Sequence, residues 1–497
     1  MKSKGAAQAV WYSLAAFLVL ALPVAIFFWQ MGTIWVYVVA QILYFLMFVV
    51  IFYLLTRKVN WVSKDDPLPP ADKTPMIIMA YPVLHEDEKT IHTAMLAMSK
   101  QDYPPDKFKV IAIPNYDDAD TIAALQRVKM QFDFLEILEV PSVSDLSWAP
   151  VWNAWESNPK AYWWHKGATK GVKDLPPKKT RQLLYLLYTA QQKYGADWVL
   201  NYIDADSIVP VTHFKSAAAG LQKYDILQST DVVGNLMDTA STSVHGFDHL
   251  GWDAMLYPHM SANGKHPFYV LGKGVFYRAR DLYDLGGFNP WIAIEDPEIG
   301  LRYWANGKKL GIIKEPLIEE VPQTFIPQGI VQRNRWMCGF FQTMASPLKE
   351  MGIKFWQRQL ARLNLVPVMS FLINLIGIPS GVWAVYLFAN GQNPYPLWAV
   401  ILSIVNIVFY ISLMTAIYVN SWKVTKPVLD GTGGRLSYFF TVNPFTLFIY
   451  WLLWLIPIAG GFFLWVTGQG KAWARTQKVD ADRRFVETGK FVRNSGV

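Results

Sequence analysis

Long apolar runs at both ends of this chain constrain its fold more than any other feature. Two runs lie near the start, at about residues 10–29 and 34–55, and three lie near the end, at about residues 365–388, 397–419 and 436–467. A helix needs about 20 apolar residues to cross the hydrocarbon core of a bilayer. The runs therefore predict a membrane protein in which a more polar middle section lies between α-helical transmembrane segments.

The composition agrees with this prediction and excludes other classes of protein. Hydrophobic residues make up 52% of the 497 residues, and aromatic residues make up 15%. The net charge of +8 does not indicate nucleic-acid binding, because the basic residues gather beside the apolar runs, as they do at a cytoplasmic membrane face. The single cysteine, Cys338, excludes an intrachain disulfide and a cysteine-based zinc site. The histidines show no metal-ligand spacing, so we interpret His245 and His249, four residues apart, as ordinary polar residues.

Basic residues on either side of the first two runs predict their orientation. Lys2 and Lys4 precede the first run, and Arg57 and Lys58 follow the second. Residues 1–58 are therefore predicted to form a transmembrane hairpin with both ends in the cytoplasm. A secretory signal is the alternative for the first run, but the run is long and lacks a small-x-small cleavage site.

The C-terminal third is predicted to return to the membrane. Residues 346–364 are basic and aromatic, which is typical of an interfacial helix. Residues 365–467 form the predicted C-terminal transmembrane region, and residues 468–497 form a cytoplasmic tail. Because both flanks of the run at 436–467 are basic, we interpret it as a re-entrant hairpin that turns near 457–461, with a single span as the alternative.

The middle section has the pattern of an α/β domain. A proline-containing linker at 59–74 leads into a predicted domain at 75–345, in which short apolar runs alternate with amphipathic ones. The expected strands lie at 76–80, 109–113 and 198–203, and the expected helices at 86–98 and 184–193. This alternation predicts a parallel sheet that binds its ligands at the carboxyl ends of the strands.

Three polar motifs within this domain have a shared chemistry. Asp204 and Asp206 follow an apolar run, and two carboxylates in one turn suit a divalent cation that bridges a diphosphate. Asp296, in the pair Glu295-Asp296, could accept a proton from an attacking hydroxyl group. The segment from Gln332 to Trp336 adds an amide, a fixed cation at Arg335 and an aromatic face, which suit a leaving phosphate and a sugar ring.

In this order and spacing the motifs resemble those of the processive branch of glycosyltransferase family 2, which includes cellulose, chitin and hyaluronan synthases. The resemblance implies a cytoplasmic catalytic domain of α/β GT-A type, Rossmann-like in its alternation, which transfers a hexose from a nucleotide-diphosphate sugar with Mg²⁺ or Mn²⁺. Asp296 would be the catalytic base, ionised at neutral pH because an ordinary Asp has a pKa of about 3.9. The implied metal ligands are Asp204 and Asp206. The implied donor-binding residues are Tyr81, Asp117, Asp118, Lys179, Asp204, Gln332, Arg335 and Trp336.

Several positions depart from the family pattern. Gln182 stands where the family has a small residue, and Ile294 stands where it has threonine. The segment 269–274 resembles the one that lines the acceptor site, but Lys273 is unusual there. The segment 145–166 looks like an insertion rich in tryptophan, for which two interpretations are open: acceptor sugars stack on its rings, or its rings lie at the bilayer interface.

The expected protein is thus a multi-pass enzyme of the inner or plasma membrane that adds sugars to a growing β-linked polysaccharide. The alternative is a glycolipid synthase with a lipid acceptor. A transporter or scaffold with an inactive transferase domain is the third hypothesis, although the firm spans hold almost no ionisable residues. The donor expected from the resemblance is a UDP-sugar, with GDP-sugars as the alternative. The expected partners are the bilayer, the acceptor, and an accessory subunit or further copies of the chain, but no nucleic acid.

Overall fold

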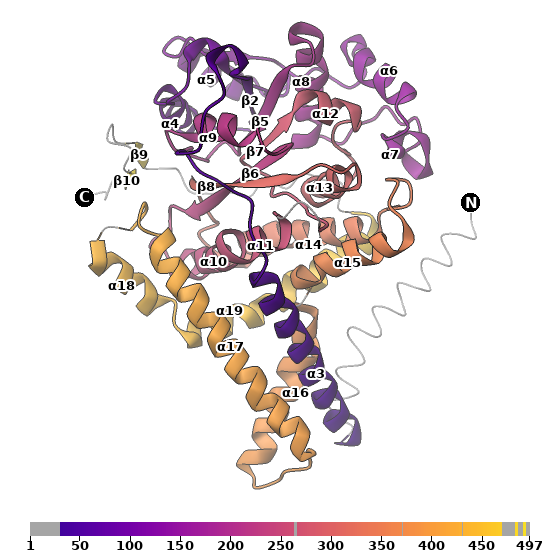
Figure 1. The fold of residues 1–497 in the computed structure, drawn as a ribbon, viewed down its shortest axis with the longest axis vertical. Helices are drawn as coiled ribbons and strands as arrows, with labels where there is room; N and C mark the ends of the chain where they lie inside the picture. Colours follow the sequence, from indigo (N-terminus) through magenta and orange to yellow (C-terminus); the bar gives the residue numbers. More distant parts are fainter. Residues whose placement is uncertain are drawn as a thin grey trace.

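A computed structural model describes residues 30–262, 266–369, 371–429, 431–469, 483–485 and 491–493. It has an α/β domain built on a central sheet, from one end of which apolar helices project (Figure 1). The predicted first span at 10–29 and most of the predicted tail at 468–497 lie outside the described residues.

The central sheet has eight strands in the order β1-β8-β6-β7-β5-β2-β3-β4. The strands are β1 (Trp61–Val62), β2 (Met76–Tyr81), β3 (Phe108–Ala112), β4 (Leu135–Ile137), β5 (Trp198–Tyr202), β6 (Ile226–Val233), β7 (Val275–Arg278) and β8 (Leu310–Glu319); β9 (Arg483–Phe485) and β10 (Phe491–Arg493) form a separate pair. The prediction of a parallel sheet was wrong for β7, which runs antiparallel to both β5 and β6. The chain enters β7 from the segment 269–274, at the edge where β5 and β6 end, so this strand must run back across the sheet.

The helices of the α/β domain cover both faces of this sheet. They are α4 (Glu88–Ser99), α5 (Ala119–Lys129), α6 (Ala149–Ser157), α7 (Tyr162–His165), α8 (Lys179–Tyr194), α9 (His213–Gly220), α10 (Ala240–Gly251), α11 (Tyr257–Ser261), α12 (Ala279–Asp284), α13 (Asp296–Ala305) and α14 (Ile330–Ala345). Side chains alternate along a strand, so Ile77 and Met79 of β2 pack against α4, α5 and α9. Ile78 and Ala80 face the core shared with α6, α8 and α13. The sheet is thus buried on both faces, as a largely parallel sheet should be.

Of the two helices expected in the α/β domain, α4 begins close to its predicted start at residue 86. Asp87 caps α4 by accepting a hydrogen bond from the Thr90 backbone nitrogen at 2.8 Å, which is a strong start signal. Helix α8 is the exception, because it begins at Lys179 rather than near residue 184. This difference places the Lys179 side chain on the first turn of a helix.

The tryptophan-rich segment is part of the core, so neither interpretation of it was right. Trp148, Trp155 and Trp163 are almost completely buried. Trp155 and Trp163 meet edge-on, and Trp148 packs against Tyr185 of α8. The Trp155 indole nitrogen donates a hydrogen bond to the Gly286 carbonyl at 2.8 Å. These rings have no free face for an acceptor sugar or a bilayer.

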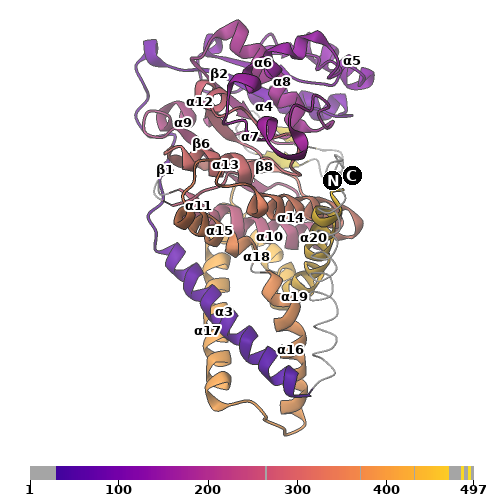
Figure 2. The same cartoon turned by 90° about the vertical axis from the view of Figure 1, so that its right-hand side faces the viewer.

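Apolar helices project from the other end of the molecule (Figure 2). The helices outside the α/β domain are α3 (Gln30–Leu55), α15 (Phe355–Met369), α16 (Phe371–Ala389), α17 (Leu397–Val424), α18 (Gly431–Thr441), α19 (Pro444–Leu453) and α20 (Leu455–Thr467). Of these, α3, α16 and α17 project away from the domain, whereas α15 and α18 lie close to it (Figure 2). Among the described residues, three stretches are long and apolar enough to cross a membrane: Ile34–Leu55, Leu397–Val424 and Pro444–Thr467. The Asn406 amide donates to the Gln41 side chain at 2.9 Å and so joins α17 to α3, a common bond between apolar helices.

The structure changes two details of this region. The expected turn near 457–461 was wrong, because α20 is helical from Leu455 to Thr467. Between residues 436 and 467 the helical path breaks instead at 442–443 and at Trp454. The run predicted at 365–388 is covered by the end of α15 and by α16. The first turn of α15 exposes Phe355 and Trp356, but its position at a bilayer interface stays a prediction.

Candidate active site

A cavity of about 260 Å³ lies where the carboxyl ends of the strands meet α10, α14 and α20. It brings together the three motifs that the sequence singled out, which come from the end of β5, the start of α13 and the first half of α14. The predicted site residues that line it are Lys179, Asp204, Asp296, Gln332, Arg335 and Trp336.

The Asp-x-Asp turn places Asp204, but not Asp206, in the lining of the cavity. Asp204 and Asp206 are both partly exposed, whereas Ala205 between them is buried. The Tyr81 hydroxyl donates a hydrogen bond to the Ala205 carbonyl at 2.7 Å. Tyr81 is itself fully buried, so its side chain supports this turn from beneath. The turn has the oxygen ligands that a hard divalent cation prefers, and Mg²⁺ or Mn²⁺ fits the residues present.

Lys179 links the turn to the rest of the site. Its ammonium nitrogen lies 3.3 Å from Asp204 Oδ1 and 3.7 Å from Glu295 Oε1, and it donates to the Gly272 carbonyl at 2.8 Å. Burial opposes the charged form of Lys179, but Asp204, Glu295 and Asp296 outweigh it and raise its pKa above the ordinary value. Lys179 therefore stays a cation in the centre of the site.

Asp296 is the first residue of α13 and lines the cavity wall, where its side chain is partly exposed. Burial and the neighbouring Glu295 carboxylate raise its pKa well above the ordinary range, while Lys179 and a hydrogen bond from the Tyr202 hydroxyl, at 3.2 Å from Oδ1, act in the opposite direction. The expectation of an ordinary pKa for Asp296 was therefore wrong. A raised pKa makes a carboxylate a stronger base once it is ionised.

The two aspartates after β3 differ in their environment. Asp118 is buried and caps α5, and its oxygens accept hydrogen bonds from the backbone nitrogens of His85, at 2.7 Å, and Thr121, at 3.4 Å. Burial opposes its ionisation, but these hydrogen bonds outweigh burial and lower its pKa. Asp117 is exposed. Neither lines the cavity, so a contact of either one with a nucleotide base stays a prediction.

Helix α14 forms the opposite wall, and it contains a residue that the sequence analysis passed over. Arg333 is fully buried. Its guanidinium lies over the rings of Trp336 and Trp454, donates a hydrogen bond to the Tyr450 hydroxyl at 2.8 Å, and lies 3.7 Å from Asp248. The Gln332, Arg335 and Trp336 side chains are thereby fixed relative to α19, α20 and α10. Arg333 stands inside the motif, and only its burial distinguishes it from Arg335.

Helix α14 packs directly against α20, and the backbones of the two helices lie close together (Figure 2). A Cβ atom added at Gly461 would lie 2.9 Å from the Asn334 carbonyl oxygen and from the Cys338 nitrogen, and one at Gly460 would collide with the Asn334 side chain. Trp454, which separates α19 from α20, also lines the cavity.

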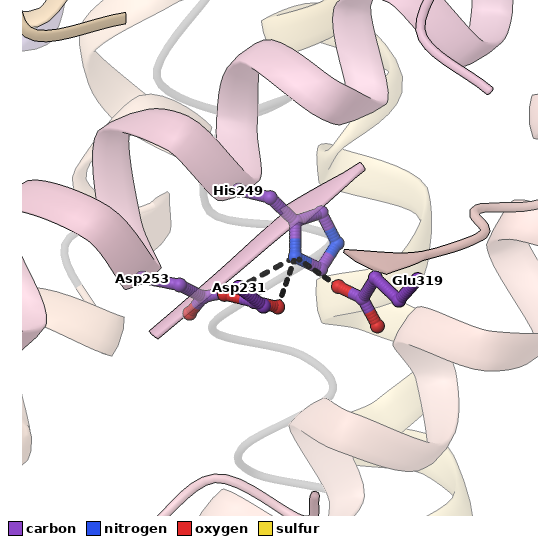
Figure 3. A group of neighbouring side chains, drawn as sticks. All are labelled: Asp231, His249, Asp253 and Glu319. Atoms are coloured by element: carbon purple, nitrogen blue, oxygen red, sulfur yellow. Dashed lines mark hydrogen bonds and ion pairs between the residues drawn. The ribbon is translucent and has the colours of Figure 1, made fainter. Parts of the chain in front are cut away.

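A second polar cluster lies in the same cavity wall and was missed from the sequence. Asp231 of β6, His249 of α10, Asp253 and Glu319 of β8 each place one ligand atom within 4.8 Å of all the others (Figure 3). Lys273, the unusual residue of the segment 269–274, forms ion pairs with Asp231, at 2.5 Å, and with Glu319. The four-residue spacing of His249 and Asp253 on one helical path was the signal that could have pointed to it.

Comparisons with known proteins place the chain in a family. A family model described as glycosyl transferase family group 2 matches residues 199–466, more than half of the chain. The chain belongs to this family. A probable glycosyltransferase of Sulfolobus acidocaldarius is 26% identical over 192 residues, which are 37% of this chain and 40% of that relative. The chain therefore aligns with less than half of that relative's length.

Two solved structures show a distant likeness to this glycosyl transferase family group 2 member. The mannosyltransferase PcManGT from Pyrobaculum calidifontis, in complex with GDP-Man and Mn²⁺, is 14% identical with a TM-score of 0.47, over 79% of this chain and 95% of that one. S. aureus TarS 1–349, in complex with UDP-GlcNAc, is 11% identical with a TM-score of 0.35, over 84% of this chain and 97% of that one.

Proposed function

We propose that this chain is an inverting membrane glycosyltransferase that transfers a hexose from a nucleotide-diphosphate sugar, by default a UDP-sugar, onto a growing β-linked polysaccharide. The observation that carries the proposal is the shared cavity, in which the Asp204 turn, Lys179, Asp296 and Arg335 surround one space. Membership of glycosyl transferase family group 2 supports the reaction class. Acidic ligands, fixed cations and a carboxylate base are the groups that transfer from a diphosphate requires.

The residues have distinct roles in the proposed reaction. Asp204 and Asp206 would hold Mg²⁺ or Mn²⁺, and the ion would supply Lewis-acid neutralisation of the negative charge on the leaving diphosphate. Lys179 and Arg335 add positive charge beside the same group. The acceptor hydroxyl oxygen bonds to the anomeric carbon from the side opposite the diphosphate, and the anomeric carbon–oxygen bond to the diphosphate breaks. Asp296 takes the hydroxyl proton, and the nucleoside diphosphate leaves with the bonding electrons.

The further proposals concern the nucleotide and the sugars. Tyr81 supports the site from below, and Asp117 or Asp118 contacts the base. The oxygens of Asp118 already accept hydrogen bonds, so Asp117 has the freer carboxylate. Gln332 and Trp336 line the cavity beside Arg335, where an amide and an indole ring suit an acceptor sugar.

The setting favours an acceptor that meets the membrane. Trp454, from the helical path Pro444–Thr467 that is long enough to cross a bilayer, forms part of the cavity wall. Two kinds of acceptor fit this arrangement. One is a polymer that leaves the cavity toward the apolar helices, and the other is a lipid that reaches the cavity from them. We favour the polysaccharide because the segment from Gln332 to Trp336 resembles that of polymerising enzymes, and we keep the glycolipid synthase as the second candidate. The catalytic domain, at about 75–345, is assigned to the cytoplasmic side of the inner or plasma membrane, with a partner subunit or a second copy completing the channel.

Nucleotide release by the purified protein in lipid nanodiscs tests the proposal. UDP- and GDP-sugars are supplied one at a time with Mg²⁺ or Mn²⁺, and the Asp296→Asn variant serves as the blank because it keeps the donor site but lacks the base. Long labelled product from one donor is the expected result. Label in a lipid-extractable species would identify a glycolipid synthase. Release from no donor, or equal release by the variant, would overturn the proposal and favour an inactive transferase domain.

A further inference from the structure

The second cluster in the cavity wall has the geometry of a ligand set. His249 Nδ1 lies 2.7 Å from Asp253 Oδ2, 3.3 Å from Glu319 Oε1 and 4.0 Å from Asp231 Oδ2. In Figure 3 the three carboxyl groups converge on the same nitrogen of the imidazole ring. They are contributed by two strands of the sheet and one helical path, so the arrangement depends on the fold and not on one local turn.

Acidic groups outnumber basic ones in this cluster. Asp231, Asp253 and Glu319 are all at least nine-tenths buried, and buried carboxylates that face one another need compensating charge. Lys273 is the ammonium group that pairs with them, through Asp231 Oδ2 and Glu319 Oε2. The nearby Asp248 has its own cation in Arg333.

Lys273 pairs with one oxygen each of Asp231 and Glu319, and the cluster presents further oxygens on the side of His249. Glu319 offers Oε2 to Lys273 and Oε1 toward His249. Among the described residues, Asp231 Oδ1 is buried without a hydrogen-bond partner. This buried oxygen gives a second cation a ligand beside Lys273.

We propose that Asp231, His249, Asp253 and Glu319 bind a divalent cation at a site separate from the Asp204–Asp206 turn. One imidazole nitrogen with three carboxylates suits Mn²⁺, Fe²⁺ or Zn²⁺ better than Mg²⁺ or Ca²⁺, which prefer oxygen ligands alone. Four protein ligands are enough to hold such an ion without a nucleotide. By contrast, the Asp204–Asp206 turn offers only two carboxylates, so we expect it to bind its ion mainly when the donor diphosphate supplies further oxygen ligands.

The ion has a structural consequence for the neighbouring site. Lys273 connects the cluster to Gly272, whose carbonyl accepts the hydrogen bond from Lys179. The Trp336 ring lies edge-on to the His249 ring, with centroids 5.8 Å apart. The ion would therefore hold the segment 269–274 and the ring of Trp336 in place. Any effect of this ordering on sugar transfer rests on the proposed function, whereas the binding of the ion does not.

The test is metal binding by the full-length protein in nanodiscs, stripped with a chelator and kept free of nucleotide. We expect one Mn²⁺ or Zn²⁺ ion per chain by equilibrium dialysis and elemental analysis. Pulsed electron paramagnetic resonance of the Mn²⁺ form should show coupling to an imidazole nitrogen. This second measurement uses the unaltered protein, so it holds even where a variant fails to fold.

Matched variants separate this site from the donor site. The double change His249→Gln and Glu319→Gln should weaken nucleotide-free binding at least 100-fold, whereas Asp204→Asn with Asp206→Asn should leave it unchanged. His245→Gln is the control on the same helix, because His245 lies outside the cluster. Absence of a bound ion, absence of nitrogen coupling, or binding lost only with the Asp204 and Asp206 changes would overturn the inference. A bound ion in a protein that transfers no sugar would overturn the proposed function and leave this inference standing.

Discussion

The Tyr202 hydroxyl donates a hydrogen bond to Asp296 Oδ1 at 3.2 Å, from the last residue of β5 to the first residue of α13. The same strand continues into the Asp204 turn, so a single backbone segment positions both the proposed metal ligands and the proposed base. Lys179 lies over the Tyr202 ring, with its nitrogen 5.0 Å from the ring centre. Tyr202 thus acts on Asp296 as a positioning residue.

Tyr202→Phe should move the pH profile of transfer. The hydroxyl stabilises the ionised form of Asp296, so its removal should raise the pKa of this carboxyl group further. Activity requires the ionised base, so the acidic limb of kcat/KM should move to higher pH. Hydrogen bonds to charged groups contribute about 1.5–3 kcal/mol, which corresponds to about 1–2 pH units.

The pH profile of nucleotide release checks this shift. Tyr103→Phe is the control, because it also removes one hydroxyl donor. The Tyr103 hydroxyl donates to the Pro75 carbonyl at 2.6 Å, and Tyr103 does not line the cavity. An unchanged acidic limb in Tyr202→Phe would show that Tyr202 does not act on the base.

Gly272→Ala should inactivate the enzyme without unfolding it. An added Cβ would lie 2.6 Å from Asp296 Oδ2 and 2.9 Å from Oδ1, so the carboxylate must move. Displacing a reacting group by about 1 Å can cost about 100-fold in rate. Initial rates of nucleotide release measure the loss, and Gly433→Ala is the control because a Cβ there meets nothing within 4 Å. Equal rates in both variants would contradict the assignment of Asp296.

Lys179→Met should lower kcat by about 100-fold or more, the scale of losing one group that stabilises developing charge. It should also move the acidic limb to higher pH, because Lys179 lowers the pKa of Asp296. Steady-state kinetics with varied donor check both effects. Lys193→Met, in the last turn of the same helix and exposed beside Glu136, should behave as the native protein. A native-like Lys179→Met would remove this cation from the mechanism.

Trp155→Ala should destabilise the catalytic domain by about 3–5 kcal/mol, the usual cost of truncating a buried tryptophan. The indole is fully buried and also loses its hydrogen bond to Gly286. Trp356→Ala removes a ring that is 79% exposed and should leave the melting temperature in nanodiscs unchanged. Similar melting temperatures for the two variants would argue against the burial of the tryptophan-rich segment.

The sequence predicted those parts of the site that are local. Asp204 follows a predicted strand, so its motif falls where parallel α/β folds bind ligands. The helix starts at Lys179 and Asp296 became visible only in the structure. The pairing of Asp231 with Glu319 could not be predicted in this way. It depends on β6 and β8 lying side by side, with Asp231 opposite Leu317 and Val233 opposite Glu319, and a single sequence contains no information on which strands pair.

Burial was the other quantity that the sequence did not provide. Tyr202 has the pattern of an ordinary strand residue, and its contact with Asp296 follows only from the packing of α13 on β5. The burial of the tryptophans in the segment 145–166 could not be predicted either, because tryptophan is equally suited to stacking on sugars, to a bilayer interface and to a protein core. The antiparallel direction of β7 also depended on where the preceding segment enters the sheet.

The tight contact between Gly461 and α14 decides what the smallest working enzyme is. Because α20 approaches the backbone of the helix that carries Gln332, Arg335 and Trp336, one side of the reaction chamber belongs to the hydrophobic C-terminal region. A water-soluble fragment ending near residue 345 would keep the sheet, the Asp204 turn and Asp296, yet its chamber would be open on the side that Trp454 closes. The catalytic unit is therefore larger than the catalytic domain.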